Sequence, residues 1–308
     1  MRLWARRSEI AAAIQRERRN PDYLAEFGIP PTVEATADLR DAVAGTRMVL
    51  LAVPSDGVKQ VCAELADYLQ DDQGVVSAAK GLEPDTGRRL SEVIEEALGP
   101  RRQGRIAALS GPNLAPEVAA ELASASVVAC EDGAFAAEAQ AALSTPRFRV
   151  YTNRDVVGVE LGGALKNIIA IGAGASDGLG FGDNAKAALL TRGLAEITRL
   201  GIALGAKPDT FRGLSGMGDL VATCAGRKSR NYRVGYEVAR GRKLADVLAE
   251  MSQVAEGVET TRAAQALAAR VNVDMPITAA VHSVLFEGES AQEAVKQLMG
   301  RTWRDELE

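Results

Sequence analysis

The sequence predicts an α/β protein in which a doubly wound parallel sheet occupies the first half and an all-helical domain the second. Short apolar runs alternate with helical stretches through the first half, which is the pattern of parallel strands joined by crossover helices. Beyond Asn153 the sequence is rich in alanine and shows no clear strand. We therefore predict two domains, residues 1–153 and 154–308.

Each apolar run of the first half has the length of a buried parallel strand. In chain order these runs are Arg2–Ala5, Arg47–Pro54, Gly74–Ala79, Arg105–Ser110, Ser126–Cys130 and Arg147–Tyr151. Helical patterns follow them at Ser8–Arg18, Ser55–Leu69, Asp85–Leu98, Ala115–Leu122 and Ala134–Leu143. In the second half, Val157–Ile171 carries apolar residues at helical spacing and is predicted to be a mostly buried helix.

Composition and charge exclude several classes of protein. The 308 residues include 36 basic and 41 acidic ones, so the net charge is −5, and only 4% are aromatic. A mildly acidic chain with few aromatic residues does not fit a nucleic-acid-binding protein. The longest apolar runs are far shorter than the roughly 20 residues of a membrane helix, and the N-terminus does not resemble a secretory signal.

Cysteine and histidine usage points to the cytoplasm and away from metal chemistry. The three scattered cysteines, Cys62, Cys130 and Cys224, fit a reducing compartment. With His282 as the single histidine, neither a His-based metal site nor a Ser-His-Asp triad is expected, and we predict no metal.

Lys166 is the first candidate for chemistry. It lies in an apolar helix, and small residues surround it at helical spacing, above all Gly162 and Gly163. The glycine pair is costly in a helix, so we expect it to leave room for a close approach. Burial would lower the pKa of Lys166 toward the range useful for proton transfer. The alternative is a lysine at the helix edge whose ammonium group reaches solvent.

Two further candidates follow predicted strands. Lys80 lies just past one strand end, and the turn Ser110–Ala115 follows the next strand and leads into a helix. Ligands of open α/β sheets bind at these ends, and exposed backbone N–H groups there can bind an anion. The alternative for Lys80 is an ordinary turn after a strand, and the alternative for Ser110–Ala115 is a tight turn with a helix cap.

The stretch Gly213–Asn231 combines a glycine-rich loop with a basic helix start. It presents Asp219 and Thr223, and then the basic and amide side chains of residues 227–231. Such donors at a helix N-terminus form an anion site, in which Arg230 could hold a phosphate. A solvated basic turn is the alternative.

One expected motif is missing. A dinucleotide fold carries a G-x-G-x-x-G turn between its first strand and helix, and no such turn follows a strand in this sequence. The glycines of Gly178–Gly182 have a similar spacing but lie in the helical half, so we interpret them as a loop.

Taken together, these stretches resemble the bacterial type of NAD(P)-dependent glycerol-3-phosphate dehydrogenase. The resemblance runs along nearly the whole chain and includes RLWARR, LLAVPS, AAKGLE, LSGPNLAPE, VELGGALKNIIAIGAG, GLSGMGDLVATC, SRN, QVAEGVET and DMPIT. It implies a Rossmann-like domain that lacks its N-terminal strand and glycine-rich loop, about 30 residues of the first βα unit.

The resemblance also implies roles for particular residues. Lys166 would be the acid and base on the C2 oxygen of the substrate, Lys80 would polarise that oxygen, and Asp219 would orient both lysines. The substrate contacts would be Lys80, Gly111, Asn113, Lys166, Asp219, Thr223, Ser229, Arg230 and Asn231. The cofactor contacts would be Arg6, Lys80, Ala115, Arg230, Val254 and Glu256.

One position departs from the family pattern, and two others bear on the choice of cofactor. Asn113 stands where bacterial members often carry Ser or Thr, although eukaryotic relatives also have Asn. Arg6 and Arg7 stand where an acidic residue would select NAD, and arginine suits the 2′-phosphate of NADP. NADP(H) is therefore the preferred cofactor, with NAD(H) as the alternative.

We accordingly expect NAD(P)H-dependent reduction of dihydroxyacetone phosphate to sn-glycerol 3-phosphate for glycerophospholipid synthesis. Two ammonium groups, of Lys80 and Lys166, should converge on one carbonyl group and lower each other's pKa. The family further implies a cytoplasmic homodimer. The alternatives are an impaired remnant of this enzyme that does not bind dinucleotide and another dehydrogenase of the β-hydroxyacid type.

Overall fold

The computed structural model describes residues 1–99, 104–226, 229–251, 254–303 and 305–306. The chain forms two compact units, each with its own core. Unit 1 comprises Met1–Ala79, Leu90–Leu109 and Asn113–Arg154. Unit 2 comprises Lys80–Arg89, Ser110–Pro112 and Asp155–Glu308, so two short segments that follow strands belong with the helical half.

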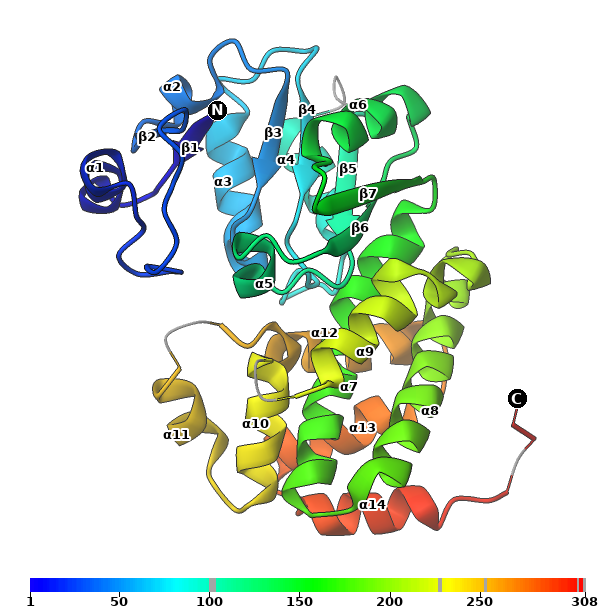
Figure 1. The fold of residues 1–308 in the computed structure, drawn as a ribbon. Coiled ribbons are helices and arrows are strands. Elements are labelled where there is room, and N and C mark those ends of the chain that lie inside the picture. Colours follow the sequence, from blue (N-terminus) through cyan, green and yellow to red (C-terminus); the bar gives the residue numbers. More distant parts are fainter. Residues whose placement is uncertain (100–103, 227–228, 252–253, 304, 307–308) are drawn as a thin grey trace. The chain divides into compact units, whose positions relative to one another are not determined.

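Unit 1 contains a five-stranded sheet in which sequential strands are neighbours (Figure 1). Its strands are β3 (Met48–Leu51), β4 (Gly74–Ser77), β5 (Ile106–Ser110), β6 (Ser124–Ala129) and β7 (Phe148–Asn153). The ladders between β3 and β4, β4 and β5, and β6 and β7 are parallel. The predicted strands are confirmed, with ends that differ by one to three residues because terminal residues pass into turns.

A second, two-stranded parallel sheet is formed by β1 (Arg2–Trp4) and β2 (Glu34–Thr36). The sequence did not predict β2, because three residues that include a glutamate and a threonine give no apolar run. Two helices accompany this pair, α1 (Ser8–Glu17) and α2 (Leu39–Val43). In the part of the chain that the structure describes, no ladder joins this pair to β3, so the sheet of unit 1 is in two pieces.

Helices cover both faces of the five-stranded sheet. Val75 of β4 packs with α3 (Val58–Leu65) and α4 (Leu90–Leu98), whereas the next residue, Val76, packs with α6 (Gly133–Leu143). Successive strand residues point to opposite faces, which explains why these strands are apolar throughout. Among the described residues, unit 1 also contains the short helices η1 (Ser55–Gly57) and α5 (Ala115–Ala119). The predicted doubly wound arrangement is confirmed.

Unit 2 is built around α7 (Val156–Gly178), on which four other helices pack most extensively. These are α8 (Gly182–Ala203), α9 (Asp219–Cys224), α10 (Arg230–Ala239) and α12 (Glu256–Arg270). Around them lie η3 (Pro208–Arg212), η4 (Leu214–Gly218), α11 (Leu244–Ala249), α13 (Pro276–His282), η5 (Ser283–Glu287) and α14 (Ala291–Met299). The described residues from Asp155 onward form no strand, which confirms the prediction of a helical second half.

The helix α7 is longer and more apolar than the sequence analysis predicted. It passes, by length and composition, for a membrane span, but 83% of its most apolar window is buried inside the protein. Its N-terminus is fixed by the Asp155 carboxylate, which accepts hydrogen bonds from the Gly158 and Lys207 N–H groups and from the Thr210 hydroxyl. The apolar side chains of α7 share one buried cluster with those of neighbouring helices, which cover its surface.

Glycines allow α7 and α10 to pack backbone against backbone. A Cβ atom on Gly235 of α10 would lie 1.8 Å from the Ile171 carbonyl oxygen, and one on Gly174 of α7 would lie 1.9 Å from that of Tyr232. No side chain fits at these positions without moving a helix, so the contact depends on glycine at both.

Candidate functional site

Lys166 lies near the middle of α7, where its side chain is buried and only 7% exposed. The alternative of a lysine at the helix edge reaching solvent is therefore wrong. Gly163, three residues earlier, faces the same region: a Cβ atom there would lie 2.5 Å from the Ser110 hydroxyl oxygen and 3.7 Å from Cγ of Lys80. Gly162 likewise faces the Ser215 carbonyl group. The glycine pair therefore does permit a close approach to α7, and the groups that come close belong to the protein itself.

Lys80 reaches the same place from the segment that follows β4. Its ammonium group donates a hydrogen bond to the Gly111 carbonyl oxygen at 2.8 Å. Gly111 itself follows β5, the neighbour of β4 in the sheet. Parallel neighbours end at the same edge, which is why two residues 31 positions apart in the chain meet here.

A single buried carboxylate joins the two lysines. One oxygen of Asp219 lies 2.9 Å from Nζ of Lys80, and the other lies 2.9 Å from Nζ of Lys166. The Asp219 side chain is 4% exposed. Lys166 also donates to the Thr223 hydroxyl oxygen at 2.6 Å, and that hydroxyl lies 3.2 Å from Asp219. Four of the residues singled out in the sequence therefore form one hydrogen-bonded cluster within unit 2.

The cluster tunes the acidity of Lys166. The pKa of its ammonium group is lowered from 10.5 to about 8, chiefly by burial and in part by the positive charge of Lys80. The Asp219 carboxylate acts in the opposite direction and keeps the pKa from falling more. A proton on Lys166 can consequently be given up or taken back near neutral pH.

A chain of side-chain amides extends the cluster toward α10 and α12. Asn231, 8% exposed, donates to Oδ1 of Asn167 at 2.9 Å and accepts from the Gly257 N–H at 2.9 Å. Asn167 in turn donates to the Lys80 carbonyl oxygen at 3.3 Å. The sequence analysis missed Asn167, although an amide inside an apolar helix is itself a signal, because a buried amide needs partners.

At the start of α10, where an anion site was predicted, some of the polar groups already form hydrogen bonds within the protein. The Ser229 hydroxyl caps the helix and accepts from the Tyr232 N–H at 3.3 Å. The exposed guanidinium group of Arg230 donates to the Val254 carbonyl oxygen at 2.8 Å, which brings two predicted contacts together. Glu256, also predicted, opens α12 two residues later. Residues 227 and 228 of the predicted basic stretch lie outside the described residues.

Three predicted residues belong to unit 1 and are not in the cluster. Arg6 is exposed between β1 and α1, while the neighbouring Arg7 pairs with Asp22. Asn113 donates to the Ser126 hydroxyl oxygen at 3.0 Å, and Ala115 is the exposed first residue of α5.

Unit 1 fits a dinucleotide in part. Its parallel sheet with helices on both faces is the architecture that binds such cofactors, and Arg6 lies at a strand end with its charge exposed. The 308 residues contain no G-x-G-x-x-G turn after a strand, and the sheet is in two pieces between β1 and β3. The architecture of unit 1 therefore fits a dinucleotide-binding domain, and the 308 residues supply no glycine turn for the pyrophosphate.

The cluster in unit 2 has a definite chemical capability. Two positive charges and a titratable proton lie around one carboxylate, with little exposure to water. Such a group can donate a proton to an oxygen atom and stabilise negative charge that develops on it.

Comparison with known proteins gives a consistent result. Residues 1–136 match the family model described as NAD-dependent glycerol-3-phosphate dehydrogenase N-terminus, and residues 155–296 match the corresponding C-terminus. The chain is 51% identical to glycerol-3-phosphate dehydrogenase [NAD(P)+] of Koribacter versatilis over 98% of this chain and 90% of that protein. The enzyme of the same name from Limosilactobacillus reuteri is 48% identical over 99% and 91%.

A solved structure agrees. The crystal structure of glycerol-3-phosphate dehydrogenase from Coxiella burnetii superimposes with a TM-score of 0.91 and 38% sequence identity, and the match covers 97% of this chain and 91% of that one.

Proposed function

The chain belongs to the NAD-dependent glycerol-3-phosphate dehydrogenase family, and from this premise we propose that it reduces dihydroxyacetone phosphate to sn-glycerol 3-phosphate, reversibly and with NAD(P)H. The observation that carries the proposal is the pair of ammonium groups, Lys80 and Lys166, held on the buried Asp219 carboxylate. Reduction of a ketone needs a proton donor and nearby positive charge, and this cluster provides both.

In the proposed mechanism the bound nicotinamide supplies the hydride to the carbonyl carbon. Lys166 donates its proton to the C2 oxygen, and in the oxidation direction it takes the proton back. Lys80 keeps positive charge beside that oxygen while negative charge develops, and the Gly111 carbonyl and Asp219 fix the direction of its ammonium group. Thr223 holds Nζ of Lys166 on the side of Asp219.

The remaining predicted residues are proposed to hold the two ligands. Arg230 and Asn231, with the Ser229 cap, would bind the substrate phosphate at the start of α10, where N–H groups and a guanidinium group favour an anion. Asn113 and Gly111 would contact the substrate. Ala115, Val254 and Glu256, together with Lys80, Arg6 and Arg230, would contact the cofactor, and the exposed charge of Arg6 favours the 2′-phosphate of NADP(H).

We further propose a cytoplasmic homodimer that supplies glycerophospholipid synthesis. The three cysteines are free and buried, which supports a reducing compartment. No nucleic acid and no membrane insertion enter this proposal.

Initial rates test the proposed function. With NADPH, dihydroxyacetone phosphate should be reduced, whereas dihydroxyacetone should lose at least about 100-fold in kcat/KM, because Arg230 and Asn231 are left without an anion. NADPH should give a higher kcat/KM than NADH. Comparable rates with the two ketones would instead favour a dehydrogenase for unphosphorylated hydroxy acids.

The pH dependence tests the assignment of Lys166. The ammonium form is the acid, so kcat/KM for ketone reduction should be level below pH 8 and fall about tenfold per pH unit above it. The amine form is the base, so kcat/KM for the oxidation should rise up to about pH 8 and then level off. Asp219→Asn should move both midpoints to lower pH, because the carboxylate raises the pKa of Lys166. An unmoved midpoint in this variant would contradict the assignment.

A further inference from the structure

The segment that carries Lys80 belongs to unit 2, although it follows a strand of unit 1. This segment, Lys80–Arg89, leaves β4 and leads into α4, and we call it the Lys80 loop. Its residue Leu82 is 2% exposed and lies in the same buried cluster as Leu161 and Leu165 of α7. Apolar burial therefore holds the beginning of the loop on the core of unit 2.

The Lys80 loop is closed by bonds between its own two ends. Leu82 and Arg89 form an antiparallel bridge. The Glu83 N–H donates to the Arg88 carbonyl oxygen at 2.9 Å, and the Glu83 carboxylate lies 2.9 Å from Nε of Arg88. A displacement of Arg89 is therefore passed to Leu82 and so to the start of the loop.

An ion pair fastens the far end of the Lys80 loop to α7. Nη1 of Arg89 lies 2.9 Å from Oε2 of Glu160, and the two side chains are 21% and 8% exposed. A carboxylate so far from water has lost most of its hydration, so a charged partner in a fixed geometry is favoured. Glu160 precedes Lys166 by six residues, about 9 Å along the helix axis. The pair thus ties the loop to the helix that carries the second lysine.

Two further positions of α7 contact Lys80 itself. A Cβ atom on Gly163 would lie 3.7 Å from Cγ of Lys80. The Asn167 amide donates to the Lys80 carbonyl oxygen at 3.3 Å. Positions 160, 163 and 167 are spaced by three and four residues, so they lie on one face of α7. This face receives both ends of the Lys80 loop and sets where Lys80 lies along the helix.

We propose that Glu160 and Arg89 are positioning residues of the reaction. Their ion pair holds the Lys80 loop on α7, and this keeps Nζ of Lys80 on Asp219, 2.9 Å away, where it faces the reacting oxygen. The two residues act through Lys80 and do not touch the substrate or the cofactor. This inference rests on the proposed function and deepens it, because it names what holds the main chain of Lys80 in place.

The acidity of Lys166 reports the position of Lys80. The positive charge of Lys80 lowers the pKa of Lys166, whereas the Asp219 carboxylate and Cys224 raise it. If the Lys80 ammonium group moves away, the pKa of Lys166 rises, and the pH at which ketone reduction declines should move upward. A smaller folded fraction would instead lower the rate by the same factor across the profile.

Steady-state kinetics of Glu160→Gln with dihydroxyacetone phosphate and NADPH test the proposal. We expect kcat to fall about 10- to 100-fold, because a misplaced ammonium group stabilises less negative charge, while KM for the ketone stays within about threefold. The midpoint of the pH profile of kcat/KM should lie about 0.5 pH unit or more above that of the wild type. Arg89→Lys keeps a cation opposite Glu160 and should retain at least about fivefold more activity than Arg89→Met.

Hydrogen exchange tests the anchoring of the Lys80 loop without an assay of activity. The N–H groups of Glu83 and Gly87 donate to carbonyl oxygens within the loop, so their exchange reports how firmly it is held. In Glu160→Gln the amide hydrogens of the loop should exchange about tenfold faster or more, measured by mass spectrometry of the peptides that contain it.

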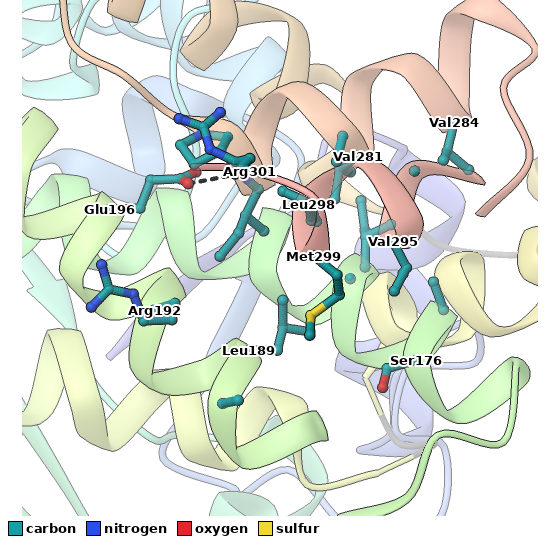
Figure 2. A pocket seen from close by; sticks show the side chains of 18 of the residues that line it. Ser176, Leu189, Arg192, Glu196, Val281, Val284, Val295, Leu298, Met299 and Arg301 are labelled. Atoms are coloured by element: carbon teal, nitrogen blue, oxygen red, sulfur yellow. Dashed lines mark hydrogen bonds between the residues drawn. The ribbon is translucent and has the colours of Figure 1, made fainter. Parts of the chain in front are cut away.

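The matched control removes a carboxylate from a different ion pair of unit 2. Oδ2 of Asp274 lies 2.5 Å from Nη2 of Arg301. Figure 2 shows Arg301 among the side chains of an apolar pocket, and no described residue of the Lys80 loop lines this pocket. Asp274→Asn should therefore match the wild type in kcat, in the midpoint of the pH profile and in the exchange of the loop.

Two results would overturn the inference. A Glu160→Gln protein with the kcat, midpoint and loop exchange of the wild type would show that the pair does not position Lys80. A lower kcat with an unmoved midpoint and unchanged loop exchange would reduce the pair to a role in stability. A wild type that does not reduce dihydroxyacetone phosphate would contradict the proposed function and the catalytic part of the inference, whereas hydrogen exchange judges the anchoring of the loop separately.

Discussion

Replacing Lys166 by methionine is expected to lower kcat/KM for dihydroxyacetone phosphate by about 10² to 10⁴-fold. The loss corresponds to removal of the general acid, whose positioned proton contributes this much. Methionine keeps the length and burial of the side chain, so the helix α7 should remain packed. The measurement is the initial rate of NADPH oxidation below pH 8, where Lys166 carries its proton.

A matched lysine controls for loss of charge. Lys243 is exposed in unit 2, where it precedes α11, and Lys243→Met should stay within about twofold of the wild type. The thermal unfolding midpoint of Lys166→Met should also stay close to that of the wild type. A loss below about tenfold in a folded Lys166→Met protein would remove Lys166 from the role of acid and leave Lys80 as the candidate.

Replacing Gly235 by alanine is expected to destabilise unit 2 by about 3 kcal/mol. The new Cβ atom would lie 1.8 Å from the Ile171 carbonyl oxygen, so α10 must move away from α7 or the protein must lose this contact. At about 2 to 4 °C per kcal/mol, the unfolding midpoint should fall by about 6 to 12 °C. Calorimetry with and without urea measures the change.

The control for this substitution is Gly226→Ala. A Cβ atom on Gly226 would meet no atom of the described residues within 4 Å, and its backbone does not have a positive φ, so this variant should change stability by less than about 0.5 kcal/mol. Equal effects of the two substitutions would mean that the close contact of α7 and α10 is not what limits stability.

Much of the fold could be predicted because its signals are local. The buried strands β4 and β5 are read from unbroken apolar runs, and both faces of each are covered. The strand β2 could not be predicted, because Glu34–Thr36 is held as a strand by its parallel pairing with β1 and not by its own composition.

The candidate site divides in the same way. Three site residues could be chosen because each is a charge that departs from its local pattern. Lys80 lies at a strand end, Lys166 in an apolar helix and Asp219 in a glycine-rich loop. Asn167 was missed because its role comes from partners 87 and 64 positions away, the Lys80 carbonyl and Asn231. Ser229 was correctly placed at a helix start, yet only the structure shows its hydroxyl used as the cap.

The sequence alone determined the class of fold, the family and the residue types available for proton transfer, since periodicity, motif order and composition are properties of neighbouring residues. Tertiary structure decided that Asp219 bridges both ammonium groups and that the pKa of Lys166 is lowered to about 8, chiefly by burial. It also decided that other atoms of the chain lie close to the backbone at Gly163 and Gly235. Distances and desolvation arise from groups far apart in the chain, so they exist only once the helices and strands are packed.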